Sequence, residues 1–243
     1  MLTIQETKLA TWDDTMKDAI WPILGHDWIT AASLGLSGGL AISWNKSIIS
    51  KIEDFSTARW IWVRAKIIPQ GNIFNIINVY APHSLSKKKL VWQQIKTLMT
   101  SRLGEPFCLI GDFNCIRNEQ ERAACIYKKI DSKFFNGILE EVGVWEVPLV
   151  KINFTWHGPA GKKSRLDRAF VNNDWPDGAR WRLEGISRKS SHHNPIILNN
   201  NHFNWGPVPF KAFNFWLEDE VFKKWIQEKM LINRGANNNG NVA

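Results

Sequence analysis

Short runs of β-branched and aromatic residues that end at glycine or proline dominate the hydrophobic pattern of the chain. Residues 73–80 lie between Gly71 and Pro82 and predict a strand. Residues 107–110 form a continuous apolar run, which is typical of a strand buried on both faces. Further strands are expected at residues 2–4, 40–44, 60–67, 154–156, 165–171, 180–186 and 196–198.

Three segments carry the signals of helices instead. Residues 85–103 place apolar side chains at steps of three and four residues, and Gly104 follows as a C-terminal stop. A second helix is expected over residues 133–142, with Asp131 or Ser132 as its N-cap, and a short one over residues 13–20. Because strands arrive in runs with a few helices between them, the pattern predicts an α+β fold.

The composition changes near residues 199–204, where an Asn-rich stretch begins. We therefore expect a folded domain over residues 1–200. Residues 201–230 read as a linker with a helix over 217–230, and residues 231–243 read as a disordered tail.

Charge and cysteine content limit the functional classes. The formal net charge of +8 favours a polyanionic partner, although a basic soluble protein without such a partner explains the charge equally well. Three cysteines without a Cys-x-x-Cys pair indicate neither a disulfide framework nor a zinc site. This usage, together with the lack of a signal peptide or membrane-spanning run, predicts a nuclear or cytoplasmic protein without membrane contact.

Polar residues that can carry chemistry follow several of the expected strands. Asp112 and Asn114 come directly after the apolar run 107–110, and Glu6 follows the strand at residues 2–4. A carboxylate in such a place can hold a hard cation such as Mg²⁺, which prefers oxygen ligands. Taken alone, an Asp/Asn turn and a surface glutamate explain these residues better.

Three further candidates lie at other strand ends. Tyr80 precedes a proline turn and could donate to a phosphate oxygen, Asp167 lies among alternating apolar residues, and His193 stands in a polar loop before a strand. A histidine can stabilise a phosphate if a carboxylate fixes its tautomer. The alternatives are a rim aromatic, a strand with surface charges and an ordinary loop.

The joint order of these residues is more specific than any one of them. Glu6, Tyr80, Asp-x-Asn at 112–114, Arg-x-Asp at 165–167 and Ser-x-His-x-Pro at 191–195 resemble the endonuclease/exonuclease/phosphatase superfamily over about the first 200 residues. That superfamily includes deoxyribonuclease I and the apurinic/apyrimidinic endonucleases. The resemblance is closest to the endonuclease domain of plant non-long-terminal-repeat (LINE-type) retrotransposons, and residues 205–217 resemble the linker to their reverse transcriptase.

The resemblance implies a four-layered α/β/β/α sandwich of the deoxyribonuclease I type, acting on DNA as a monomer without a small-molecule cofactor. It implies that Glu6 is the principal Mg²⁺ ligand, with Mn²⁺ as an alternative ion. It also implies that Asp112 activates the attacking water and that Asn114 positions it.

The remaining site residues are expected to contact the phosphate or to lie beside it. By resemblance, Tyr80 contacts the phosphate, while Asn78 and His83 shape the substrate-binding wall beside it. His193 stabilises the transition state and is oriented by Asp167. An in-line attack on a phosphodiester requires a cation and hydrogen-bond donors directed at the negative charge that develops on the phosphate.

Two features depart from the family pattern. The family begins with a complete strand that bears an Asn, whereas this chain has five residues before Glu6, so we expect the first N-terminal strand to be missing. The family also has an aspartate where His192 stands, and an imidazole does not replace a carboxylate as a Mg²⁺ ligand. We therefore expect an endonuclease with reduced activity, with a catalytically dead, nucleic-acid-binding remnant and a phosphoester phosphatase as alternatives.

Overall fold

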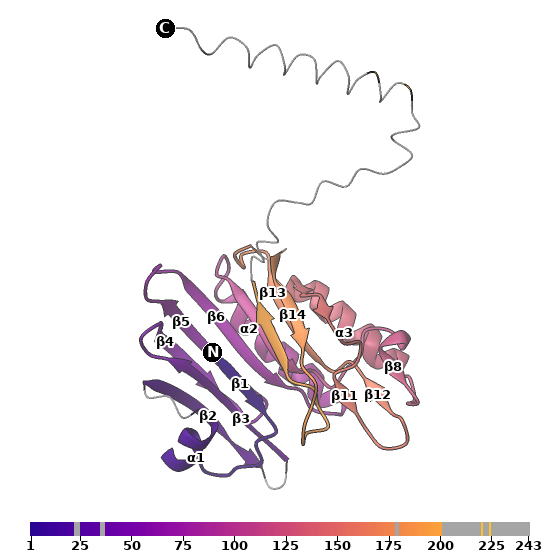
Figure 1. Ribbon diagram of the computed structural model, residues 1–243, viewed down its shortest axis with the longest axis horizontal. Coiled ribbons are helices and arrows are strands. Elements are labelled where there is room, and N and C mark those ends of the chain that lie inside the picture. Colours follow the sequence, from indigo (N-terminus) through magenta and orange to yellow (C-terminus); the bar gives the residue numbers. More distant parts are fainter. Residues whose placement is uncertain (22–24, 35–36, 178–179, 201–219, 221–223, 225–243) are drawn as a thin grey trace. The chain divides into compact units, whose positions relative to one another are not determined.

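A six-stranded sheet forms the centre of the structure (Figure 1). The structure is a computed structural model and describes residues 1–21, 25–34, 37–177 and 180–200 together with Glu220 and Lys224. In spatial order, the strands are β4 (Ile49–Ser56), β5 (Trp60–Ile67), β6 (Ile73–Tyr80), β7 (Phe107–Asp112), β13 (Asp167–Asn172) and β9 (Val144–Glu146). β6 and β7 pair in parallel, and the other neighbours are antiparallel.

Two three-stranded sheets form a second layer. One has the order β1 (Leu2–Gln5), β3 (Ser37–Asn45), β2 (His26–Leu34), and the other has the order β10 (Leu149–Val150), β14 (Arg182–Gly185), β15 (Ile196–Asn199). Two separate apolar clusters bury their inner faces against the central sheet, one around Leu40, Ile42 and Trp44 and one around Leu183. In the described part of the chain, β1 and β15 each end their sheet and do not pair with each other.

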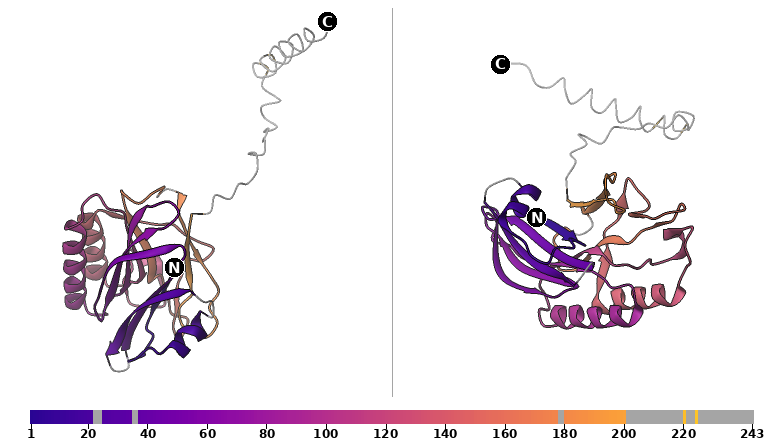
Figure 2. Two further views of the ribbon diagram at one scale, coloured as in Figure 1. Left: turned by 90° about the vertical axis from the view of Figure 1, so that its left-hand side faces the viewer. Right: turned by 90° about the horizontal axis from the view of Figure 1, so that it is seen from below.

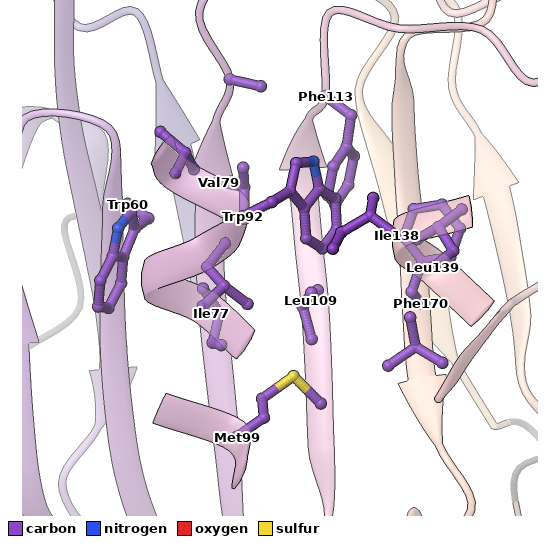
Figure 3. Close-up of a cluster of buried hydrophobic side chains, with 14 of the residues drawn as sticks. Trp60, Ile77, Val79, Trp92, Met99, Leu109, Phe113, Ile138, Leu139 and Phe170 are labelled. Carbon is purple, nitrogen blue, oxygen red and sulfur yellow. The ribbon is translucent and has the colours of Figure 1, made fainter. Parts of the chain in front are cut away.

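Two helices cover the opposite face of the central sheet, α2 (Leu85–Thr100) and α3 (Lys129–Val142) (Figure 2). Trp92 of α2 stacks on Phe113, with ring centroids 5.9 Å apart, and Leu139 of α3 joins the same core (Figure 3). The smaller elements are helix α1 (Asp14–Ile20), the 3-10 turn η1 (Glu119–Glu121) and a small sheet of β11 (Trp156–His157), β12 (Lys163–Ser164) and β8 (Arg122–Ala123).

Most of the predicted elements are confirmed, with differences at their ends. The predicted helix over 85–103 ends at Thr100, and the predicted strand over 165–171 begins only at Asp167. The predicted start of the next helix at residue 133 is wrong, because α3 begins at Lys129 and neither Asp131 nor Ser132 caps it. Strands β2 and β4 were not predicted.

The α+β class is confirmed, while the finer architecture stays a prediction. The central sheet, its two helices and the two separate small sheets make three layers, and α1 has no buried residue that would mark it as a fourth. The missing first strand also stays a prediction. The linker, helix and tail predicted for residues 201–243 lie outside the described residues, apart from Glu220 and Lys224. Among the described residues, we find no helix with the length and apolar character needed to cross a membrane.

Gly111 sets how closely β6 and β7 approach each other just before their ends. Its φ of 139° is one that side chains rarely adopt, and a Cβ here would lie 2.1 Å from the carbonyl oxygen of Val79. Only glycine permits this backbone contact without a shift of the strand. The contact holds the ends of the two strands, Tyr80 and Asp112, side by side.

Candidate active site

Three of the predicted polar side chains lie in one row across the central sheet. Tyr80 is the register partner of Asp112 in the β6–β7 pair, and Asp167 is the register partner of Asp112 in the β13–β7 pair. Each of the three residues is at most 5% exposed. The topology therefore brings together residues that are far apart in the sequence.

Glu6 joins this row from the second layer. It follows β1, and its carboxylate accepts a hydrogen bond from the hydroxyl of Tyr80. Burial and then the hydrogen bond to Glu6 raise the pKa of Tyr80 above its ordinary value. The phenol therefore stays protonated at neutral pH and acts as a hydrogen-bond donor.

Asp112 is a carboxylate that titrates near neutral pH. Burial and then the negative charge of Asp167 raise its pKa to about 7, against the opposing effect of His193. One oxygen of Asp112 accepts the backbone N–H of Asn114 at 2.8 Å, which fixes its orientation. A group with such a pKa can accept a proton from water under physiological conditions.

His193 and Asp167 form a hydrogen-bonded pair, a contact that the family resemblance implied. The distance from Nδ1 of His193 to Oδ2 of Asp167 is 2.9 Å. Burial lowers the pKa of His193, but the hydrogen bond with Asp167 and the charges of Asp167 and Asp112 outweigh it, so its pKa lies above the ordinary value. Thr155 holds the backbone of Asp167 in turn, because its Oγ1 accepts the Asp167 N–H at 2.9 Å.

The loop that carries Asn114 is fixed from three sides. Asn114 has a left-handed backbone with φ of 46°, and its Nδ2 donates to the carbonyl of Ala81 at 2.8 Å. Its own carbonyl accepts from Nζ of Lys88 at 2.7 Å. The side chain of Lys88 is 4% exposed and also pairs with Asp131 of α3 at 3.4 Å. Lys88 thus ties the loop to both helices.

These residues surround a cavity of about 470 Å³. Its wall contains Glu6, Tyr80, His83, Asp112, Asn114 and His193, all predicted site residues. A neighbouring groove of about 600 Å³ is lined by β1, the end of β7, Asp167 and residues 190–196, including His192. Glu6, Asp112 and His193 line both spaces, so the two meet at the predicted site.

Asn78 is the one predicted site residue that does not line either space among the described residues. Its side-chain nitrogen donates to the carbonyls of Ile4 and Ala41 at 3.0 Å, and its oxygen accepts from Gln5. The structure therefore uses Asn78 to hold β1 and β3 on β6, which positions Glu6.

The carboxylates of the site suit a hard cation bound largely through water. No group of three or more His, Cys, Asp or Glu side chains within the described residues is arranged to hold a metal ion. Mg²⁺, however, keeps several waters and takes only one or two protein carboxylates. Glu6, which lines both spaces, and Asp112, whose pKa is raised in part by the charge of Glu6, provide such a pair.

Four lining or supporting residues were not found from the sequence: Lys88, Arg122, Thr155 and Trp156. Lys88 lies within a run of three lysines, which is typical of a solvated helix start. It differs from the other two lysines because it lies on the face of α2 that packs on the loop carrying Asn114. Trp156 reaches the site through an isolated bridge to His193. Neither relation leaves a local signal in the sequence.

Comparisons with known proteins agree with this geometry. The model of the endonuclease/exonuclease/phosphatase family matches residues 1–191. No curated protein sequence matches the chain.

Solved structures with the same fold include enzymes of several kinds. The endonuclease domain of TRAS1, a telomere-specific non-LTR retrotransposon, has a TM-score of 0.56 at 16% identity and covers 74% of this chain and 80% of its own. The AP endonuclease LMAP from Leishmania major has a TM-score of 0.59 at 14% identity, covering 80% and 76%. The mannosyl-6-phosphatase Bt3783 from Bacteroides thetaiotaomicron has a TM-score of 0.51 at 16% identity, covering 76% and 79%.

At these identities the structures show a shared fold, while the family model covers most of the chain. The match of the family model over residues 1–191 establishes that the chain belongs to the endonuclease/exonuclease/phosphatase family.

Proposed function

We propose that this chain is a Mg²⁺-dependent phosphodiester hydrolase that nicks DNA. The proposal rests on one observation. Glu6, Tyr80, Asp112 and the His193–Asp167 pair lie together where strands β6, β7 and β13 of the central sheet end or begin. Asp112 supplies a base, His193 a hydrogen-bond donor that can carry a positive charge, and Tyr80 a neutral donor. Attack on a phosphodiester requires such groups around the phosphate.

Each side chain has a part that follows from its protonation state. Asp112, with a pKa near 7, takes the proton of the attacking water, and Asn114 orients that water. His193, whose pKa is raised by the hydrogen bond with Asp167, stabilises in its protonated form the negative charge that develops on the phosphate oxygens. When the substrate is bound, the hydroxyl of Tyr80 would turn from Glu6 and donate to another of these oxygens. A cation held by Glu6 would add Lewis-acid stabilisation of the same charge.

Several features support DNA as the substrate and a retroelement as the origin. The net charge of +8 favours a polyanion, and the TRAS1 endonuclease domain, which shares the fold, belongs to a retrotransposon. Residues 205–217 resemble the linker that follows such endonucleases in plant LINE-type elements. The free cysteines Cys108, Cys115 and Cys125 suit a nuclear or cytoplasmic site of action, and we expect a monomer.

The groove between β1 and β15 supports the expectation that a strand is missing from the second layer. β1 and β15 end their respective sheets, and Ile110 and Gly111 of the central sheet form part of the groove between them. A strand that paired with both edges would join the two small sheets and cover this floor. Within the described residues, β1, which leads to Glu6, has no strand partner on this side.

A substitution at His192 tests the second departure from the family pattern, the histidine that stands where the family has an aspartate. It lines the groove beside Glu6, Asp112 and Asp167, where a further carboxylate would add an oxygen ligand for the cation. We expect His192→Asp to raise the rate of plasmid nicking in Mg²⁺ at least about tenfold, equivalent to about 1.4 kcal/mol of barrier. His192→Asn, which removes the imidazole without adding a carboxylate, is the matched control for the new oxygen ligand.

The function itself is tested by incubating supercoiled plasmid with the purified chain in Mg²⁺ and in chelator. Conversion to open circles in Mg²⁺ alone supports the endonuclease. DNA binding without nicking, even after His192→Asp, would identify a catalytically dead remnant. Release of phosphate from inositol phosphates without nicking would identify a phosphatase on the same fold.

A further inference from the structure

The cavity of about 470 Å³ separates its charges into two ends. The carboxylates Glu6 and Asp112 lie with Tyr80 and His193 at the reactive end described above. The rest of the wall includes Lys88, Arg122 and Lys128, and the acid among them, Asp131, is already paired with Lys88. The cavity therefore continues from the reactive cluster onto a cationic surface.

The small sheet shows how far apart the two ends lie. His193 bridges to Trp156 of β11, Trp156 pairs with Ser164 of β12, and Ser164 pairs with Arg122 of β8. At about 4.8 Å between neighbouring strands, the backbones of His193 and Arg122 are roughly 14 Å apart. A single phosphate held at His193 cannot span this distance, but a nucleic acid strand, with one charge per roughly 3.4 Å of helix axis, can.

Arg122 is held in place for such a contact. Its Nε donates to Oγ of Ser164 at 3.1 Å, and one terminal nitrogen donates to the carbonyl of Ile126 at 2.9 Å. A guanidinium has five N–H donors, so these two bonds orient the group and leave further donors for an anion. Lys128, the exposed residue that precedes α3, adds a second charge to the same wall.

We propose that Arg122 and Lys128 form a subsite for a second phosphate of the bound DNA strand, further along the strand from the phosphate that is cleaved. This inference rests on the proposed function for the identity of the reactive end. It also names the substrate class more closely, because a subsite for a second phosphate favours a polynucleotide over an ester with a single phosphate.

The first experiment measures binding without catalysis. A fluorescent DNA duplex is titrated in chelator with the wild type, with Arg122→Met/Lys128→Met and with Lys129→Met, an exposed neighbour that is not part of the cavity wall. We expect the double variant to raise Kd at least about tenfold at low salt. The slope of log Kd against log salt should fall by about 0.9, since the double variant loses its contact with one phosphate. Lys129→Met should change both values less.

The second experiment uses bis(4-nitrophenyl) phosphate, a diester with a single phosphate. The kcat/KM of the double variant should fall much less on this diester than its plasmid nicking, which should fall at least about tenfold. Arg122→Lys, which retains the charge, should recover part of the DNA affinity and controls for misfolding.

The outcomes separate the two proposals. Unchanged affinity and salt slope in the double variant would overturn the subsite whether or not the chain nicks DNA. An equal loss on both substrates would also overturn it, because Arg122 would then act on the reactive centre. If the wild type hydrolyses neither substrate but the double variant loses affinity and slope, the subsite stands and the enzymatic function fails.

Discussion

The substitution Asp112→Asn is expected to lower DNA nicking in Mg²⁺ at least about a hundredfold, the lower end of what a positioned general base contributes. Asparagine retains the shape of the side chain, and its oxygen can still accept the N–H of Asn114. It cannot take a proton from water at neutral pH. The rate of conversion of supercoiled to open-circular plasmid measures the effect.

The same variant carries its own control for folding. The pKa of Asp112 is raised by burial from 3.8 to about 7, so its ionisation costs stability as the pH rises through this range. Asparagine removes this cost. In chelator at pH 8, Asp112→Asn should therefore melt at the same temperature as the wild type or higher. A variant that nicks at the wild-type rate would exclude Asp112 as the base.

The substitution Arg168→Met is expected to have the largest effect on stability. Arg168 is 0% exposed and pairs with Glu121 and, at 2.6 Å, with Glu146. Removing one partner from a buried ion pair costs about 3–5 kcal/mol. Because Glu146 keeps Arg165 and Arg117 as partners, we expect a loss near the lower end, about 3 kcal/mol, or a fall in Tm of about 6–12 °C.

The pH dependence of this loss identifies its cause. Burial acts to raise the pKa of Glu146, but the charges of Arg168 and Arg165 outweigh it and hold that pKa below its ordinary value of 4.5. The stability from this pairing is present above pH 4.5 and is lost as the pH falls through the lower, folded-state pKa. Thermal melts should therefore differ less between variant and wild type in acid. Arg180→Met, at an exposed arginine, controls for the loss of charge, and an equal effect there would contradict the account.

The sequence allowed the strand ends to be predicted but not how they meet. An apolar run that stops at Asp112, or at Tyr80 before a proline, is a local signal. The register that puts Asp167 opposite Asp112 depends on strand pairing across a long stretch of chain, which no local pattern encodes. The family resemblance, rather than periodicity, brought these residues together before the structure did.

Other features escaped prediction for physical reasons. β4 is an edge strand whose side chains are mostly exposed, so its hydrophobic alternation is weak. The N-terminus of α3 has no side-chain cap. A prediction that depended on an N-cap residue therefore placed the first residue of the helix too late in the sequence. Lys88 differs from Lys87 and Lys89 only in its place on α2, where it faces the loop that carries Asn114. In each case tertiary contacts decided what the local sequence left open.

The Mg²⁺ dependence of plasmid nicking by the wild type and by Glu6→Gln tests the central claim most directly. If Glu6 holds the cation beside Asp112, the wild type should nick only with a divalent ion, and Glu6→Gln should need at least about tenfold more Mg²⁺ for half of its maximal rate. Thermal melts in chelator should be similar, since Tyr80 can still donate to the amide oxygen. An identical Mg²⁺ dependence for the two proteins, or nicking that persists in chelator, would contradict the account.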